Sequence, residues 1–334
     1  MKPKKTTGEG KRKIMSQSLL LLILIAALCI IATLVNPRFI HLSNLINILQ
    51  QISVLGVVAS GVGMLLIAGE IDISVGSQVS LMGIVMAAII QKGGQIPPDA
   101  PNAWFIAWSI PIAIIVTFII GAVLGFINGI TVIKSRAASF IITLGFGSVY
   151  KGIALLISHG GSFMLFGKFE TLGRVKIFNF LPVSILFFFG VVILTYVILK
   201  YTRYGRFIYA IGGNRTAAFV SGINTNRVTM NGFIIVGILN ALAALILISR
   251  VGTALATTAD AYSLDALASV VVGGIAITGG KGKALDIFLG VLLIGLVSNA
   301  LVIMNINPYL RSMVIGLIII MAVTFRGLSD KRIS

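Results

Sequence analysis

The sequence predicts an all-α membrane protein with about ten transmembrane helices. Of its 334 residues, 57% are hydrophobic and 10% are charged, whereas soluble domains carry about 25% charged residues. The apolar residues gather in runs that approach the roughly 20 residues a helix needs to cross a bilayer. Glycine is frequent, at 37 residues, as it is where membrane helices pack closely.

The apolar runs form one domain, residues 16–325, between short basic tails at residues 1–15 and 326–334. The third and eighth runs are short and interrupted by glycine, as in the broken helices that line transport pathways. The ten runs are residues 16–35, 47–68, 76–90, 104–130, 138–157, 183–199, 228–249, 264–277, 284–304 and 309–325.

The first run follows a basic segment, as the apolar core of a signal peptide does. It lacks a small-residue cleavage site and is longer than such a core usually is, so we expect an uncleaved first helix. Ten spans from a cytoplasmic N-terminus place both termini in the cytoplasm. Eighteen of the 26 Lys and Arg residues then lie on that side, as the positive-inside rule predicts. The net charge of +17 therefore does not indicate nucleic acid as a partner.

Two features bear on packing and on contacts outside the membrane. Gly121, Gly125 and Gly129 have the four-residue spacing of a small-residue ridge, which predicts close helix packing within the chain, with a dimer seam as the alternative. The external loop at residues 158–181 is rich in Phe. It is either a segment that rests at the membrane surface or a platform on which an external protein docks.

The stretch AGEIDISVGS, residues 68–77, places Glu70 and Asp72 between two spans. Ionisable groups at such a depth are costly and mark functional sites. The apolar residues alternate with Glu70, Asp72, Ser74 and Gly76, which predicts extended backbone, and Ser77 follows them. Asp72 or Ser74 then caps the next helix. The acids serve either capping alone or also a polar route that suits neutral, hydroxyl-rich solutes.

The longest cytoplasmic loop, residues 200–227, contains a second signal, IGGNRTAAFVSG. Asn214 is a candidate N-cap and Gly222 a candidate stop for a helix of about two turns. Such a helix projects four apolar side chains into the cytoplasm, which suits insertion into a partner's groove. The alternative is a solvated basic loop. The four side chains are those of Ala217, Ala218, Phe219 and Val220.

Enzymatic and cofactor sites find no support in the sequence. The two histidines, His41 and His159, have no partner at metal-ligand spacing. Gly274 and Gly279 have the spacing of a phosphate-binding loop, but Gly280 stands where that motif requires Lys. We therefore expect no catalytic residue, no metal and no cofactor in this chain, and no ATP binding by the chain itself.

Three segments in order resemble the ribose-type family of ABC-importer permease subunits. EIDISVGS is similar to that family's G-I-D-L-S-V-G-S signature, and GRFIYAIGGNRTAAFVSGI is similar to its G-R-x-x-x-A-x-G-G-N-x-x-A-A-x-x-S-G-I segment. LDALASVVVGGIAITGGKG is similar to its third block. One departure is Glu70, where many members of the family have Gly.

The resemblance implies a pore-forming subunit in the bacterial inner membrane, present as a homodimer or a heterodimer with a similar permease. A cytoplasmic ATPase, which binds the ATP, and an external sugar-binding protein complete the importer. The segment that couples to the ATPase carries over to Gly212, Gly213, Asn214, Ala217, Ala218, Phe219, Ser221 and Gly222. The substrate-pathway motifs carry over to Asp72, Ser74, Gly76, Ser77, Asp265, Gly273 and Gly274, with Glu70 beside them.

We therefore expect import of a monosaccharide, ribose-like, by alternating access that a separate ATPase drives. The same role for galactose, a furanone-type signalling sugar or a nucleoside stays open, because nothing in the sequence separates these substrates. An ion-coupled secondary transporter is the alternative outside the class, and it would not need the helix at residue 214. A membrane-embedded enzyme would need a convergent catalytic set, which the sequence lacks.

Overall fold

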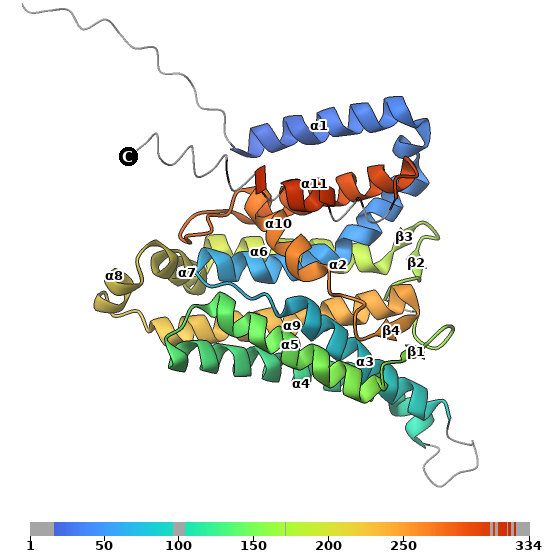
Figure 1. Cartoon of the computed structure of the whole chain (residues 1–334), viewed down its shortest axis with the longest axis horizontal. Helices are drawn as coiled ribbons and strands as arrows, with labels where there is room; N and C mark the ends of the chain where they lie inside the picture. Colours follow the sequence, from blue (N-terminus) through green and yellow to red (C-terminus); the bar gives the residue numbers. More distant parts are fainter. Residues whose placement is uncertain are drawn as a thin grey trace, which may run out of the picture.

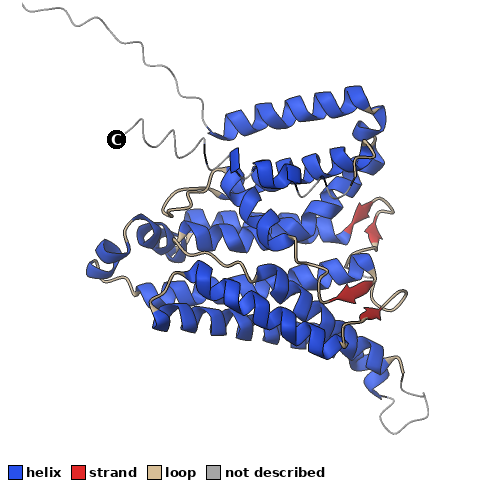
Figure 2. Ribbon diagram, viewed as in Figure 1, coloured by secondary structure: helices blue, strands red, loops and turns tan. Residues whose placement is uncertain are grey.

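The computed structural model describes residues 17–95, 104–170 and 172–307, and beyond them residues 310, 313–318, 320, 321 and 324. The expected tails, residues 1–15 and 326–334, lie outside these ranges. The described residues form mostly helices, with four short strands (Figure 2). The strands are β1 (Ser162–Met164), β2 (Lys176–Ile177), β3 (Leu181–Pro182) and β4 (Thr253–Leu255). The helices are α1 (Gln17–Val35), η1 (Pro37–Ile40), α2 (Leu42–Ile67), α3 (Val75–Gly93), α4 (Trp104–Ser135), α5 (Ser139–Ser158), α6 (Val183–Tyr201), α7 (Arg203–Gly213), α8 (Arg215–Val220), α9 (Thr225–Val251), α10 (Tyr262–Gly273) and α11 (Ala284–Ile303).

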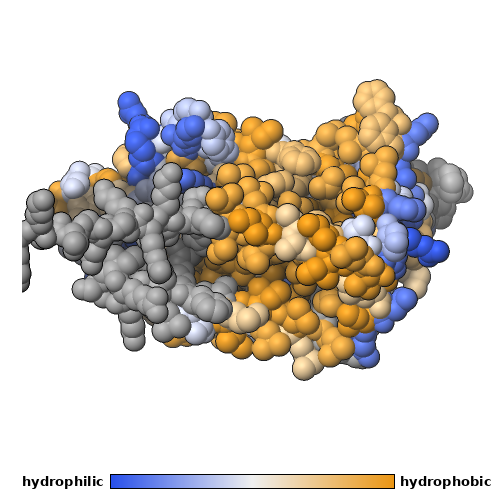
Figure 3. Space-filling model, turned by 90° about the horizontal axis from the view of Figure 1, so that it is seen from above, coloured by the Kyte–Doolittle hydropathy of each residue, from blue (hydrophilic) through white to orange (hydrophobic). Residues whose placement is uncertain are grey.

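The prediction of an all-α polytopic membrane protein is confirmed. Within the described ranges, eight helices are long and apolar enough to cross a membrane: α1 to α6, α9 and α11. The short helix α10 coincides with the eighth predicted span, and the tenth, residues 309–325, falls largely outside the described residues. Figure 3 shows an apolar band between hydrophilic residues at the two ends of the molecule, as expected for a surface that faces lipid.

The bundle has two distinct ends (Figure 1). One carries α7 and α8 and is here called the α8 end; the opposite one, which carries the four strands, is called the strand end. At the strand end β1 pairs antiparallel with β4, and β2 with β3. The β1–β4 pairing fastens the loop at residues 158–181 to the end of α9, and the loop buries its own Leu165 and Phe169 side chains. The loop is therefore anchored through its own packing, while Phe178 is 84% exposed.

Two helices begin deep in the bundle and meet there by their N-termini. Residues 68–74 are not regular helix, and Figure 1 shows them running from the α8 end toward the middle before α3 begins. From the opposite end, residues 256–261 lead into α10. The Gly76 N–H donates to Ser263 Oγ at 3.0 Å, and the Ala259 N–H donates to Ser80 Oγ at 3.0 Å. The break at residues 68–74 thus faces the one that precedes α10.

The glycines of α4 pack against α9, as predicted from their spacing. A Cβ atom on Gly121 would lie 2.4 Å from the carbonyl oxygen of Gly237, and one on Gly125 would lie 2.3 Å from that of Phe233. Both contacts are with backbone atoms, which cannot move aside. The two backbones therefore touch, and α9 becomes one of the most buried helices, with 72% of its best apolar window inside the protein.

Replacing Gly125 by Ala tests this contact. Overpacking at backbone contact distance is expected to lower the free energy of unfolding by about 1–3 kcal/mol, seen as a lower thermal midpoint in detergent. Gly152→Ala is the matched control, because Gly152 is also helical and a Cβ atom there meets nothing within 4 Å. An unchanged midpoint for Gly125→Ala would contradict the assigned contact.

Candidate functional site

Asp72 lies at the centre of a buried polar cluster. It is 2% exposed and accepts hydrogen bonds from the Ser74 N–H at 2.8 Å and the Ser74 hydroxyl at 2.6 Å. The side-chain amides of Gln78 and Asn128 each donate to its second oxygen at 3.3 Å. A carboxylate at this depth is tolerated only when such partners replace water.

The cluster extends to two further helices. The Tyr150 hydroxyl on α5 donates to Asn128 Oδ1 at 2.6 Å, and the Asn240 amide on α9 donates to Gln78 Oε1 at 3.0 Å. The break, α3, α4, α5 and α9 therefore join around Asp72. The sequence prediction missed these partners, although Asn128 is the lone amide of the predicted span 104–130 and Asn240 lies within an apolar stretch of the span 228–249. Ser74 occupies the N-cap position of α3, but its side chain makes no capping bond there.

Glu70 forms an ion pair with the short helix α8. It is 7% exposed, and its Oε1 lies 2.5 Å from Nη1 of Arg215, the first residue of α8. Nη2 of Arg215 also donates to Thr229 Oγ1 on α9 at 3.3 Å. The pair borders a cavity of about 690 Å³ between the break, the α4–α5 turn and α8. The residue at which the chain departs from the family pattern is thus the one that connects the break to α8.

Glycines of the three sequence motifs meet at one point at the α8 end. The Gly280 N–H donates to the Ile67 carbonyl oxygen at 2.8 Å. A Cβ atom on Gly212 would lie 1.8 Å from that same oxygen, and one on Gly279 would lie 2.9 Å from the Gly69 Cα. Gly279 also has a φ of +85°, which side chains disfavour. Three chain segments that lie far apart in the sequence here touch backbone to backbone.

The short helix α8 forms as the sequence predicts. The Ala217 N–H donates to Asn214 Oδ1 at 2.9 Å, and Gly222 follows the helix with a φ of +84°. Phe219 is 67% exposed and Val220 is 81% exposed. The expectation that Ala218 also projects is wrong, because Ala218 packs inward and is 5% exposed.

Two tyrosines hold α7, which carries Gly212 and Gly213 at its C-terminal end. The Tyr209 hydroxyl donates to the Gly282 carbonyl oxygen at 2.7 Å, and the Tyr204 hydroxyl donates to that of Val228 at 3.2 Å. Burial raises the pKa of the Tyr209 hydroxyl, and the nearby Asp286 carboxylate raises it further. The hydroxyl therefore stays protonated and keeps its role as a donor.

The remaining predicted pathway residues lie in different parts of the structure. Ser77 lies beside Gly147 of α5, and Asp265 is buried in the first turn of α10, next to a second cavity. Gly273 instead packs against the backbone of Asp286 on α11, and Gly274 ends α10 with a φ of +126°. The two glycines thus shape a helix end and do not line either cavity. Gly213 and Ser221 are exposed beside α8.

Comparison with known proteins supports a transport role. The family model described as branched-chain amino acid transport system / permease component matches residues 44–323. The chain is 35% identical to the ribose import permease protein RbsC of Haemophilus influenzae, over 94% of this chain and 93% of that protein. It is 35% identical to RbsC of Bacillus subtilis, over 89% and 88% respectively. It is 33% identical to the galactose/methyl galactoside import permease protein MglC of Escherichia coli K12, over 89% and 90%. No solved structure matches the chain.

The Asp72 cluster predicts a stability effect. Asp72→Ala leaves buried amide and hydroxyl donors without an acceptor, which costs about 1–3 kcal/mol of unfolding free energy. The matched control is Asp260→Ala, because the Asp260 carboxylate is 37% exposed and its ion pair among the described residues is with Lys151. An ion pair of that exposure contributes about 0–1 kcal/mol. Equal losses for the two variants in a detergent unfolding assay would show that the cluster does not have this role.

Proposed function

This chain belongs to the family of branched-chain amino acid transport system / permease components, and from that premise we propose that it is the pore-forming subunit of an ATP-driven importer for a monosaccharide. The similarity to ribose and galactose import permeases over most of the chain supports a sugar as the substrate. Among the monosaccharides, ribose is the substrate that we propose first. The chain is not itself an enzyme in this assignment, since a partner subunit hydrolyses the ATP.

One observation carries the mechanism: α8 presents an exposed apolar pair, Phe219 and Val220, and is tied to the break by the Glu70–Arg215 ion pair. An apolar pair on a capped helix fits a groove in a partner protein. The partner is a cytoplasmic ATPase whose subunits approach one another when they bind ATP. Movement of α8 then pulls on residues 68–70 through the ion pair and through the glycine contacts at Gly212.

The Asp72 cluster passes that movement on. Residues 68–74 connect the α8 end to the first turn of α3, and Asp72 joins them to α4, α5 and α9 through hydrogen bonds. Because these hydrogen bonds form in one arrangement of the helices, displacement of the break relative to a single helix would break some of them, so the helices move together. Opening toward one side of the membrane then accompanies closing toward the other, which is alternating access.

The α8 end faces the cytoplasm in this proposal. Lys200, Arg203, Arg206, Arg215 and Arg227 gather there, in agreement with the positive-inside rule. Ten spans then place both termini in the cytoplasm of a bacterium, with the chain in its inner membrane. The strand end faces an external sugar-binding protein, for which the exposed Phe178 and Phe180 offer contact surface. A second copy of the chain, or a related permease, completes the pore.

Uptake by the reconstituted importer tests the proposal. Proteoliposomes with the ATPase and the binding protein are expected to accumulate ribose only when ATP is present. Replacing both Phe219 and Val220 by Ser removes the apolar anchors and is expected to lower uptake roughly tenfold or more. Tyr201→Ser, which changes an exposed aromatic residue outside α8 at the same end, is expected to leave uptake unchanged.

Three outcomes contradict the proposal. Uptake of leucine in place of any monosaccharide would assign the chain to another substrate class. Uptake that requires a proton or sodium gradient and no ATP would identify a secondary transporter. Normal uptake by the Phe219 and Val220 double variant would show that α8 does not couple to the ATPase.

A further inference from the structure

A second cavity lies where α10 begins, on the opposite side of the bundle's centre from α8. Its volume is about 330 Å³, and α2, α9, α10 and α11 contribute to its walls. Apolar side chains such as Ile52, Leu55 and Leu247 form one part of the lining. The polar part consists of Gln51, Arg250, Thr258, Tyr262, Asp265 and Ser298.

This set of polar groups matches a neutral, polyhydroxylated ligand. A sugar hydroxyl both donates and accepts, and the lining offers a carboxylate that accepts, a guanidinium that donates and hydroxyls and an amide that do both. The aromatic ring of Tyr262 and the aliphatic wall suit the C–H face of a sugar ring. The cavity lies at the lower end of the size range of small-molecule sites, about 300–1,000 Å³, so a monosaccharide fits better than a larger solute.

Ser298 on α11 points to a ligand independently. It is 2% exposed, and its hydroxyl has no hydrogen-bond partner among the described residues. A buried hydroxyl without a partner is unfavourable, so such groups are rare without a reason. Because Ser298 lines this cavity, a ligand hydroxyl there would satisfy it.

The start of α10 adds a favourable field. Ala261 occupies its N-cap position and supplies no side-chain cap. A half-helix whose N-terminus lies inside a membrane protein directs its first N–H groups and the positive end of its dipole toward a bound polar group. Tyr262 and Asp265, in the first turn, belong to both the helix end and the cavity.

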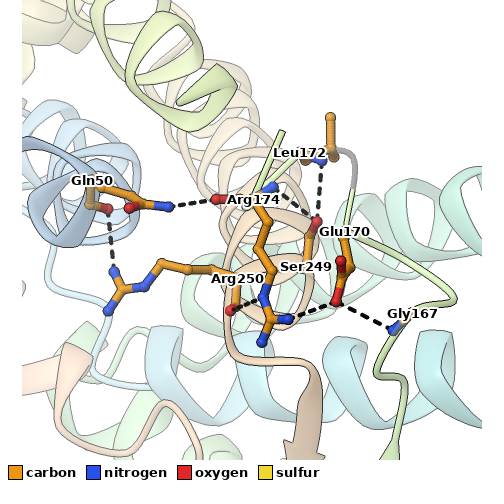
Figure 4. A network of polar contacts seen from close by, with 8 residues as sticks. Gln50, Gly167, Glu170, Leu172, Arg174, Ser249 and Arg250 are labelled. Carbon is orange, nitrogen blue, oxygen red and sulfur yellow. Dashed lines mark hydrogen bonds and ion pairs between the residues drawn. The ribbon is translucent and has the colours of Figure 1, made fainter. Parts of the chain in front are cut away.

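Arg250 connects the cavity to the loop at the strand end (Figure 4). Its Nη1 donates to the Gln50 carbonyl oxygen at 3.2 Å, and Arg174 Nε donates to the Arg250 carbonyl oxygen at 3.2 Å. Arg174 in turn pairs with Glu170 of the loop at 2.6 Å. The Gln50 amide donates to the Gly173 carbonyl oxygen. One wall of the cavity is thus held in place by the surface that an external protein would contact.

We propose that this cavity is the monosaccharide-binding site of the permease, with Ser298, Asp265, Thr258, Gln51 and Arg250 as the groups that bind sugar hydroxyls. The assignment rests on the proposed function, and it places sugar binding at α10, away from Asp72. Asp72 and its partners then hold the helices together, while the solute meets the other half-helix.

Site-directed alkylation tests the assignment without relying on transport. Cys29 is the chain's only cysteine, so a Cys29→Ser background accepts a single reporter, Ser298→Cys. The rate of its reaction with a small maleimide in membranes is expected to fall at least threefold in 100 mM ribose or galactose and to stay unchanged in 100 mM leucine. Ser184→Cys is the matched control, because Ser184 is a buried serine of α6 whose hydroxyl is equally unpartnered but lines no described cavity. Its rate is expected not to respond to sugar.

The outcomes distinguish failure of the cavity assignment from failure of the proposed function. Sugar protection of Ser298→Cys but not of Ser184→Cys supports the site, and Thr258→Cys provides a second reporter from another wall if the first variant does not fold. If sugar protects neither Ser298→Cys nor Thr258→Cys in an importer that takes up ribose with ATP, the cavity assignment is overturned and the proposed function is not. Equal protection at Ser184→Cys would indicate a general conformational response and also overturns it. Absence of monosaccharide uptake by the complete assembly overturns the proposed function and this assignment with it.

Discussion

The fold depends on the burial of one carboxylate, that of Asp72. A carboxylate at that depth needs polar partners, and they come from Ser74 in the break itself and from the neighbouring helices. Ser74, Gln78, Asn128, Tyr150 and Asn240 supply them or support those that do. The requirement fixes the start of α3 against three helices and interrupts the span before it. That interruption is in turn what allows α10 to enter from the opposite end and meet α3.

The interrupted span also connects a small helix at the surface to the interior. α8 has only six residues and little contact with the bundle of its own. Its first residue is paired with Glu70, and the preceding Gly212 touches the backbone at Ile67. One contact is with the break and the other is with the last turn of α2. A displacement of α8 would therefore first displace residues 67–70. Lipid-facing helices such as α1, with 11% of its best apolar window buried, lie outside this connection.

Much of this arrangement follows from local sequence patterns, and some of it does not. Nine predicted spans correspond to helices because apolar length is a local property, and the cap at Asn214 and the stop at Gly222 follow from residues within one turn. The inward position of Ala218 could not be read from its neighbours, because it depends on how α8 lies on the protein. Glu70 and Arg215 lie 145 residues apart in the sequence, and Asp72 and Asn128 lie 56 apart. Patterns in a single sequence do not show which residues so far apart come into contact. The resemblance groups Gly273 and Gly274 with Asp265, whereas the structure places them at the end of α10, outside the lining of the cavity.

The most direct test of the connection between α8 and the break is the number of sugar molecules imported per ATP hydrolysed, measured for charge exchanges at the Glu70–Arg215 pair. The account predicts that Glu70→Arg and Arg215→Glu each lower this ratio severalfold, because like charges then separate α8 from the break, and that the double exchange restores most of it. Wild-type ratios in both single variants, or a double variant no better than the worse single one, would contradict the account.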